Sequence, residues 1–215
     1  MKTKLIKSVS GNKVEPFEQI DLYEIQNKAN SSSKGFIQEV FLKNAGTNSG
    51  TIQYLKPAIE IFGTETPHSS NFLFHKMEKK QAGSKIPVLL VHGAGANAWI
   101  WCYDPIESIS KDTLIFKLAE NGFPTYAISS ACPQGSNYFQ AEHIISAIEI
   151  IKQETGKDKV NVIATGDGNI PVQLYLSSST RYPWMRKYDN SVDKYIGLGS
   201  PNLGIDYQFD ILLQA

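Results

Sequence analysis

The sequence predicts an α/β protein whose main part is a parallel β-sheet with helices on both faces. Three observations support this class: near-continuous apolar runs typical of buried parallel strands, amphipathic segments between these runs, and glycine-rich turns directly after two of them. Strands that alternate with helices favour right-handed crossovers and therefore a parallel sheet. The alternation begins at Lys85, and 215 residues suffice for one sizeable domain.

Four apolar runs are the expected strands of this sheet. They cover residues 86–92, 124–129, 159–165 and 193–200. The first, "IPVLLVH", is apolar almost throughout, as a strand buried on both faces should be. Each of the first three runs is followed by turn-forming residues and then by a helical pattern.

Three helices are expected between the strands, at residues 112–122, 138–156 and 169–179. Glycines at the ends of the first two act as stop signals. The second helix carries an apolar stripe, which predicts one face packed on the sheet. That stripe consists of Ala141, Ile144, Ile145, Ile148 and Ile151. His143 falls near the polar edge of the stripe, so we expect it to be solvated.

Residues 1–84 differ in character, being polar and interrupted by turn formers. Two short runs there, residues 35–42 and 57–63, favour β-structure. We therefore expect N-terminal strands and loops that pack on the edge of the sheet. The α/β core is assigned to residues 85–215.

Composition excludes several classes of function. The 21 basic residues equal the 21 acidic ones, so no charged surface suited to nucleic acid is expected. The chain has neither a signal-peptide pattern nor an apolar run long enough to cross a membrane, which predicts a soluble protein, cytoplasmic unless the native N-terminus differs. Cys102 and Cys132 fit no zinc pattern, and both a pair of buried thiols and one disulfide remain open. No metal or cofactor is expected.

The first glycine-rich turn, residues 92–99, permits two interpretations. It contains G-x-G-x-x-A from Gly93 to Ala98, which nominally fits a dinucleotide site. Such a site needs a helix that begins in the glycines and an acidic residue after the next strand, whereas here a bulky sequence follows and the next strand ends in Ser129 and Ser130. The alternative is an oxyanion hole, in which the backbone amide of Ala94 is one donor.

A second strand, turn and helix at residues 160–171, "VNVIATGDGNIP", would supply the other donor. With "PVLLVHGAG" and "KYIGLGSPNLG", this stretch resembles the α/β-hydrolases, and most of all bacterial lipases and esterases, over about residues 85–205. Their elbow is commonly A/G-H-S-x-G-G, and their next strand ends L-G-[ST]-P. The family continues with further strands and a catalytic histidine, whereas this sequence stops about ten residues after "GLGSPNLG". The resemblance thus implies a sheet truncated after the sixth strand. The sequence is then either a fragment of a longer protein or a fold retained without its catalytic activity.

The resemblance also assigns the residues of the elbow. Gly166 stands where the family has its serine nucleophile, and the amide of Asp167 would be the second oxyanion donor. The flanking positions are filled by Ala164, Thr165, Gly168 and Asn169. The function implied is ester hydrolysis of the lipase type, inactive or strongly impaired because the serine is replaced and no histidine follows it. A non-catalytic binding or interaction module with the same fold is the alternative.

Other side chains are candidates for the missing roles. Asp167 could be a nucleophile, as in epoxide hydrolases and dehalogenases, or could cap the helix that follows. The histidines at positions 68, 75, 92 and 143 all precede Gly166, and Asp206 and Asp210 are candidate acids or surface residues. For an apolar ester or acyl ligand, the expected contact residues are His92, Gly93, Trp99, Trp101 and Tyr138. An exposed edge strand would offer a surface for oligomer formation.

Overall fold

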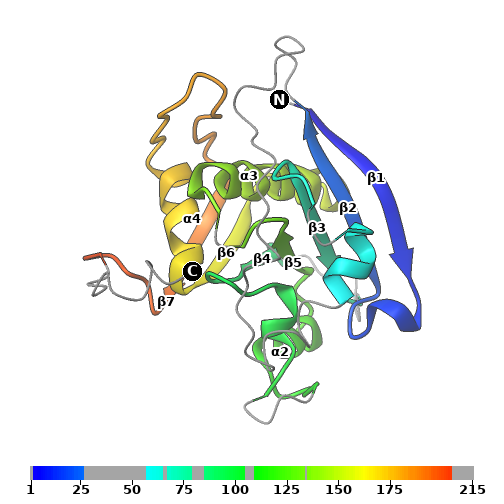
Figure 1. Ribbon diagram of the computed structural model, residues 1–215. Helices are drawn as coiled ribbons and strands as arrows, with labels where there is room; N and C mark the ends of the chain where they lie inside the picture. The colour runs from blue at the N-terminus through cyan, green and yellow to red at the C-terminus, as the bar shows by residue number, and fades with distance from the viewer. Residues whose placement is uncertain are drawn as a thin grey trace, which may run out of the picture.

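The computed structural model describes residues 2–26, 57–64, 67–78, 85–104, 109–133 and 135–204 (Figure 1). These residues form one seven-stranded sheet in the order β1-β2-β3-β5-β4-β6-β7. The strands are β1 (Lys2–Ser10), β2 (Gln19–Gln26), β3 (Asn71–Lys76), β4 (Val88–Val91), β5 (Thr125–Ser130), β6 (Val160–Thr165) and β7 (Val192–Leu198).

The second half of the sheet is parallel, as the sequence predicts. β4 lies between β5 and β6, and β7 follows β6 at the edge. In register, Leu89 of β4 faces Tyr126 of β5 on one side and Val162 of β6 on the other. The other pairs are antiparallel: β1 pairs with β2, β2 with β3, and β3 with β5. The N-terminal strands thus continue the same sheet, which is mixed rather than wholly parallel.

One β-favouring run of the N-terminal part is helical instead. Residues 57–62 form a short helix, so the expectation of a strand at residues 57–63 was wrong. Pro57 suits the first position of a helix, where its missing N–H is not needed. Ala58 and Ile61, three positions apart, are both buried, which is the spacing of one helical face. The other run, residues 35–42, lies outside the described residues.

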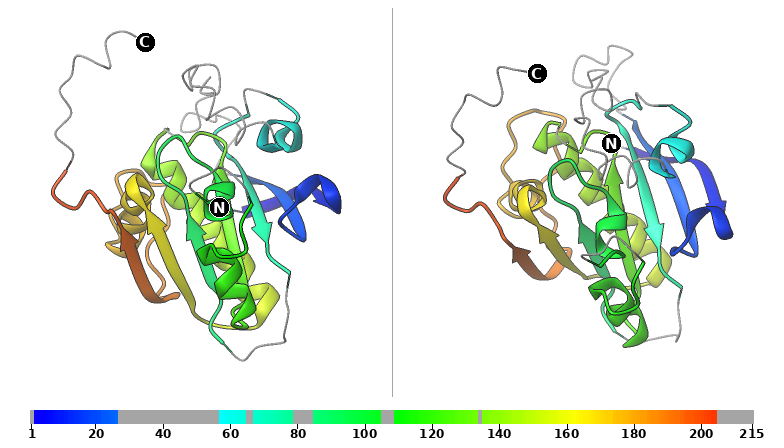
Figure 2. Two further views of the ribbon diagram at one scale, coloured as in Figure 1. Left: turned by 90° about the horizontal axis from the view of Figure 1, so that it is seen from below. Right: turned by 60° about the horizontal axis from the view of Figure 1, so that its bottom comes forward.

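Helices cover both faces of the sheet, which the sequence also predicts (Figure 2). On one face, α3 (Asn137–Thr155) and α4 (Asn169–Leu176) pack in one hydrophobic cluster with Leu89 and Val91. On the other face, α2 (Leu114–Glu120) and the 3-10 helix η3 (Ala98–Trp101) pack with Val88 and Leu90. Successive side chains of β4 thus point to opposite faces, and both faces are buried.

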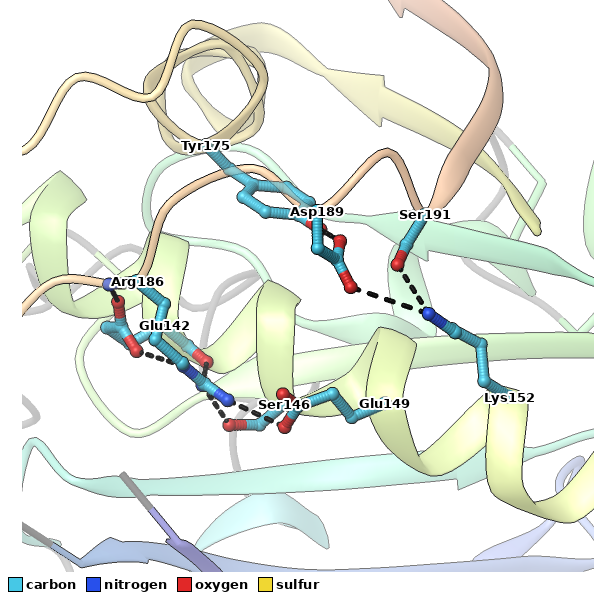
Figure 3. Close-up of polar contacts among 8 residues, drawn as sticks. All are labelled: Glu142, Ser146, Glu149, Lys152, Tyr175, Arg186, Asp189 and Ser191. Carbon is cyan, nitrogen blue, oxygen red and sulfur yellow. Dashed lines mark hydrogen bonds and ion pairs between the residues drawn. The ribbon is translucent and has the colours of Figure 1, made fainter. Parts of the chain in front are cut away.

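The helix α3 is buried more widely than its stripe predicts. It ends where Gly156 takes a left-handed conformation with φ +66°. His143 is only 1% exposed and its ring stacks on Phe72 with centroids 5.2 Å apart, so the expectation of a solvated histidine was wrong. The physical reason is that His143 lies on the sheet side of α3, where its ring nitrogens bond Ser69 O and Ser130 Oγ. Residues 177–191 bury other side chains of the same helix (Figure 3).

The two cysteines are both buried, and no disulfide joins them in the described structure. Cys102 follows η3, and Cys132 lies in the turn after β5. Of the two possibilities that the sequence leaves open, the structure therefore has the pair of buried thiols. Within the described ranges, no helix has the length and apolar character that crossing a membrane would require.

Candidate functional site

The two glycine-rich turns lie next to each other at one edge of the sheet. The first follows Val91 at the end of β4, and the second follows Thr165 at the end of β6. These strands are parallel neighbours, and Val91 faces Ala164 in register. In open α/β sheets, ligands bind outside the carboxyl ends of such strands. The turns thus lie where a site is expected on topological grounds.

The turn after β6 is sharp, and its apex is Gly166. Thr165 is still extended, with φ −122°, whereas Gly166 has φ +52°. Residues Gly166–Gly168 form one turn of 3-10 helix, η4, and α4 begins at Asn169. Asp167 is not among the residues with positive φ, so the left-handed position of this elbow belongs to Gly166 rather than to Asp167.

Glycines allow the two turns to touch. A Cβ on Gly93 would lie 3.0 Å from the carbonyl oxygen of Thr165 and 3.7 Å from the amide nitrogen of Asp167. A Cβ on Gly168 would overlap the carbonyl oxygen of His92 and lie 2.9 Å from the carbonyl carbon. Backbone therefore packs on backbone between these turns, and any side chain at Gly93 or Gly168 would separate them.

At Gly166 the situation is different, because there is room for a side chain. A Cβ built there meets only the Cα of Gly93, at 3.9 Å, which is ordinary van der Waals contact. The positive φ would strain any L-residue at this position by about 1 to 2 kcal/mol. A small side chain would therefore find space at this apex, and only the backbone conformation would oppose it.

The amide of Ala94 is the candidate donor on the first turn. Two other amides of that turn are used internally: Gly95 N–H donates to Pro133 O at 3.3 Å, and Ala96 N–H donates to Gly93 O at 3.3 Å. Within the described part of the chain, no backbone hydrogen bond engages the amide of Ala94, and this residue is exposed. Its N–H is thus free to meet a ligand.

His92 does not face this opening. Its Nδ1–H donates to the carbonyl oxygen of Gly93 at 2.7 Å, and its Nε2 accepts from the backbone N–H of Ser130 at 3.2 Å. The ring is 1% exposed, and burial lowers its pKa to about 4. The imidazole is therefore neutral near pH 7, and it connects the first turn to β5.

Two more histidines pair with serines in the interior, which the sequence analysis missed. His75 Nε2 lies 2.8 Å from Ser129 Oγ, and this hydroxyl accepts from the amide of Ala98 at 2.9 Å. His143 Nε2 lies 2.9 Å from Ser69 O, so it carries the proton, and Nδ1 accepts from Ser130 Oγ at 3.2 Å. Consecutive serines at the end of a buried strand were the available signal, because buried hydroxyls need partners.

The predicted aromatic residues lie in two different environments. Trp99 and Trp101 are buried in the core, where Trp99 packs edge-on against His75 with centroids 4.8 Å apart. Tyr138, at the start of α3, is half-buried and packs edge-on against Tyr182 with centroids 5.4 Å apart. The structure therefore brings Gly93, Gly166 and Asp167 together and places the tryptophans in the core.

Asp167 has two alternative roles, as a nucleophile or as the cap of α4, and in the described residues no hydrogen bond to its carboxylate supports either. No backbone N–H of α4 donates to its carboxylate there, although the residue stands in the turn before the helix. No group of three or more His, Cys, Asp or Glu residues suited to a metal occurs in the same residues. Asp206 and Asp210 lie outside the described ranges.

A dinucleotide site finds no support in the first turn. The glycines lead into η3, a 3-10 helix of four residues, and not into an α-helix. The aligned amides and dipole of an α-helix N-terminus, which hold a pyrophosphate in such sites, are therefore absent from this turn. The next strand, β5, ends in Ser129 and Ser130 without an acidic residue.

Comparison with known proteins places these features in context. No family model matches the sequence, and a search of curated proteins finds no match. Among solved structures, the mature form of a Bacillus licheniformis lipase aligns with TM-score 0.46 and 20% identity, over 60% of this chain and 46% of the lipase. The propeptide form of the same lipase gives TM-score 0.45 and 20% identity, over 60% of this chain and 25% of that one.

A 2-hydroxy-6-oxo-6-phenylhexa-2,4-dienoate hydrolase from Rhodococcus aligns with TM-score 0.36 and 21% identity, over 60% of this chain and 43% of the hydrolase. The chain thus spans less than half the length of each of these proteins. In its own topology, β4 and β6 are parallel neighbours with touching glycine turns, and α4 follows the second turn. The chain has an α/β-hydrolase-like fold.

Proposed function

We propose that this chain binds an ester or acyl ligand at the elbow, as a protein of the ester-hydrolase type, and that it hydrolyses such ligands at most very slowly. The observation that carries the proposal is the elbow itself. Gly166 has the left-handed backbone and free space of a nucleophile position, yet it offers no side-chain atom for attack. An elbow without a nucleophile can polarise a carbonyl group but cannot form an acyl-enzyme.

The backbone supports binding of a carbonyl oxygen between the two turns. The amide of Ala94 is unused by the described backbone, and that of Asp167 lies beside the first turn. Two backbone N–H donors at this place favour binding of the carbonyl oxygen of an ester. The carboxylate of Asp167 belongs to the same residue as one donor, so its charge disfavours an anionic ligand.

The expected rate follows from known serine hydrolases. Loss of the nucleophile lowers kcat by on the order of 10⁶, while the oxyanion hole and binding together leave roughly 10³ to 10⁴ over water. Turnover therefore distinguishes an impaired esterase from a pure binding module. The first would show slow, saturable hydrolysis and the second only saturable binding.

The test is a titration of the protein with methyl decanoate, followed by the backbone amide shifts of Ala94 and Asp167 in NMR. We expect saturable shifts at these amides. Ala94→Pro removes one donor and should weaken the affinity about tenfold, the effect of about 1.4 kcal/mol. Saturable shifts confined to other parts of the protein, or no shifts at all, would contradict the proposed site.

Hydrolysis of p-nitrophenyl butyrate tests the second half of the proposal. The parent protein should show no acyl-enzyme burst. Gly166→Ser should also remain close to the parent, because His75, His92 and His143 are buried with other partners. His68, the fourth histidine, is half-buried and bonds Ser70 Oγ at 2.7 Å within its own loop. A parent protein that turns over at the rate of a serine hydrolase would overturn the assignment of Gly166 as an empty nucleophile position.

A further inference from the structure

Asn169, the first residue of α4, is fully buried, and its side-chain amide joins the elbow to β7. Nδ2 donates to the carbonyl oxygen of Gly166 at 2.7 Å and to that of Leu198 at 3.3 Å. Oδ1 accepts from the hydroxyl of Tyr195 at 2.6 Å. Carbonyl oxygens can only accept hydrogen bonds, so these partners determine which end of the amide is the nitrogen.

The strand β7 leaves space for this amide. A Cβ on Gly197 would lie 2.8 Å from Asn169 Oδ1 and 3.0 Å from Tyr195 Oη, so a larger residue would displace them. One turn along α4, Gln173 extends the contacts by donating to Asn202 Oδ1 at 2.7 Å. The side-chain amide of Asn169 therefore lies in space that a side chain at position 197 would fill.

The hydrogen bond to the carbonyl group of Gly166 acts directly on the amide of Asp167. This C=O and the following N–H belong to one planar trans peptide unit, so the direction of one determines the direction of the other. Gly166 has no side chain and is the most permissive residue type, so its own conformation restrains this unit little. A hydrogen bond from a buried side chain supplies the restraint.

We propose that Asn169 is a positioning residue that orients the amide of Asp167 toward the ligand. This role rests on the proposed function, in which that amide is a donor to a carbonyl oxygen. The elbow of the lipases that the sequence resembles commonly has glycine at this place, so the device is a property of this chain. The hydrogen bond from Asn169 keeps the peptide unit between Gly166 and Asp167 in place. With a bulkier residue at position 166, the turn itself would restrain that unit.

The NMR order parameter of the Asp167 N–H tests the role without any ligand, because it reports how firmly this peptide unit is oriented. Asn169→Asp is nearly isosteric and turns an oxygen toward two carbonyl oxygens, so the order parameter should fall from the rigid range near about 0.85 toward about 0.6. Tyr195→Phe removes the hydrogen bond to Oδ1 and the one accepted from Gln173 Nε2, and it should give a smaller fall. It also keeps the test valid if the first variant folds poorly.

Gln173→Ala is the matched control, because Gln173 belongs to the same polar network but makes no contact with Gly166. It should leave the order parameter of Asp167 unchanged. The positioning role is wrong if Asn169→Asp and Tyr195→Phe both leave that order parameter at the parent value, or if Gln173→Ala lowers it equally.

A double-mutant cycle tests the fit between α4 and β7. Gly197→Ala alone should lower the urea midpoint, because its methyl group meets the amide of Asn169. In the background of Asn169→Gly, the same methyl group enters vacated space, so the second substitution should cost much less. Contacting residues give such non-additive effects, whereas strictly additive losses would contradict the proposed complementarity.

Ester binding separates this inference from the proposed function. If both hold, Asn169→Asp binds methyl decanoate about tenfold more weakly than the parent, the equivalent of about 1.4 kcal/mol. If the parent binds no ester, the proposed function fails, and the order parameters still decide the role of Asn169. If the parent and Asn169→Asp bind the ester equally well, the positioning role fails and the proposed function stands.

Discussion

The carbonyl group of His92 occupies the space that a side chain on Gly168 would need. A Cβ at Gly168 would overlap the carbonyl oxygen and stand 2.9 Å from the carbonyl carbon. The two residues belong to different turns, one after β4 and one after β6, so their contact sets how closely these turns approach. Because both partners are backbone, neither can move aside as a flexible side chain would.

Gly168→Ala should therefore destabilise the protein by about 3 kcal/mol, the upper part of the usual range for overpacking. Urea unfolding measures this as a lower midpoint. Gly156→Ala is the matched control: Gly156 ends α3 with φ +66°, but no heavy atom lies within 4 Å of its Cβ position. Its cost should be limited to backbone strain, about 1 to 2 kcal/mol. Equal losses in both variants would show that the turns can separate freely.

A buried ion pair attaches residues 177–191 to α3 (Figure 3). Arg186 Nε donates to Glu142 Oε2 at 2.7 Å, and its backbone N–H donates to Oε1 at 2.7 Å. The same guanidinium group donates to Glu149 and Ser146. The side chain of Glu142 is 0% exposed, so Arg186→Ala leaves a buried charge without its partner and should cost about 3 to 5 kcal/mol in urea unfolding.

Two further variants make this expectation specific. Replacing both partners, Glu142→Leu with Arg186→Met, should cost less than Arg186→Ala alone, because no unpaired charge remains. Lys152→Ala tests the second attachment of the same segment, in which Lys152 lies 3.4 Å from the carboxylate of Asp189. That pair is partly exposed, so about 1 kcal/mol or less is expected. A loss as large as that of Arg186→Ala would contradict this ranking.

The parallel half of the sheet could be predicted because its signal is local. The run at residues 86–92 is apolar at consecutive positions, and Val88 to Val91 are buried on both faces. Gly156 ends α3 because a left-handed residue is needed there, and glycine adopts that conformation without strain. In both cases the sequence itself carries the physical cause, so no distant residue has to be known.

The contacts that define the site depend on residues far apart in the sequence. Asn169 meets Tyr195 across 26 positions, and Arg186 meets Glu142 across 44. Glu142 lies outside the apolar stripe of α3, and Arg186 of the segment folded over this helix meets its buried carboxylate. His143 is buried for a different reason, because its ring stacks on Phe72 of β3 and bonds Ser69 and Ser130. Periodicity shows which face of a helix is apolar, but not how many neighbours cover the rest.

The free thiols give a chemical test of the fold around η3 and β5. Cys102 is fully buried and Cys132 is 5% exposed, and burial raises the pKa of the Cys102 thiol. Thiolates are the reactive species, so both should react slowly with Ellman's reagent in the native protein. In urea without reductant, two thiols per chain should react quickly. No reactive thiol in urea would mean that the cysteines are bridged.

Buried histidines should make the protein less stable as the pH falls below about 6.5. Burial lowers the pKa of His92 to about 4 and that of His143 to about 3, and the nearby charges of His92 and Arg186 add to the shift at His143. Burial also lowers the pKa of His75. In the unfolded chain these groups have their ordinary pKa near 6.5, so below that pH the unfolded state binds protons that the folded state does not.

The sign follows from linkage. Above about pH 7 the histidines are neutral in both states and contribute no slope, whereas between about pH 6.5 and pH 4 each should reduce the free energy of unfolding, by about 2 kcal/mol at pH 5. Urea midpoints from pH 7.5 to 4.5 measure the profile. His143→Gln keeps a donor for Ser69 O and cannot titrate. Its free energy of unfolding should therefore fall less with decreasing pH, by the contribution of one histidine. A parent protein whose midpoint stays constant over this range would show that these rings are reached by water and titrate normally.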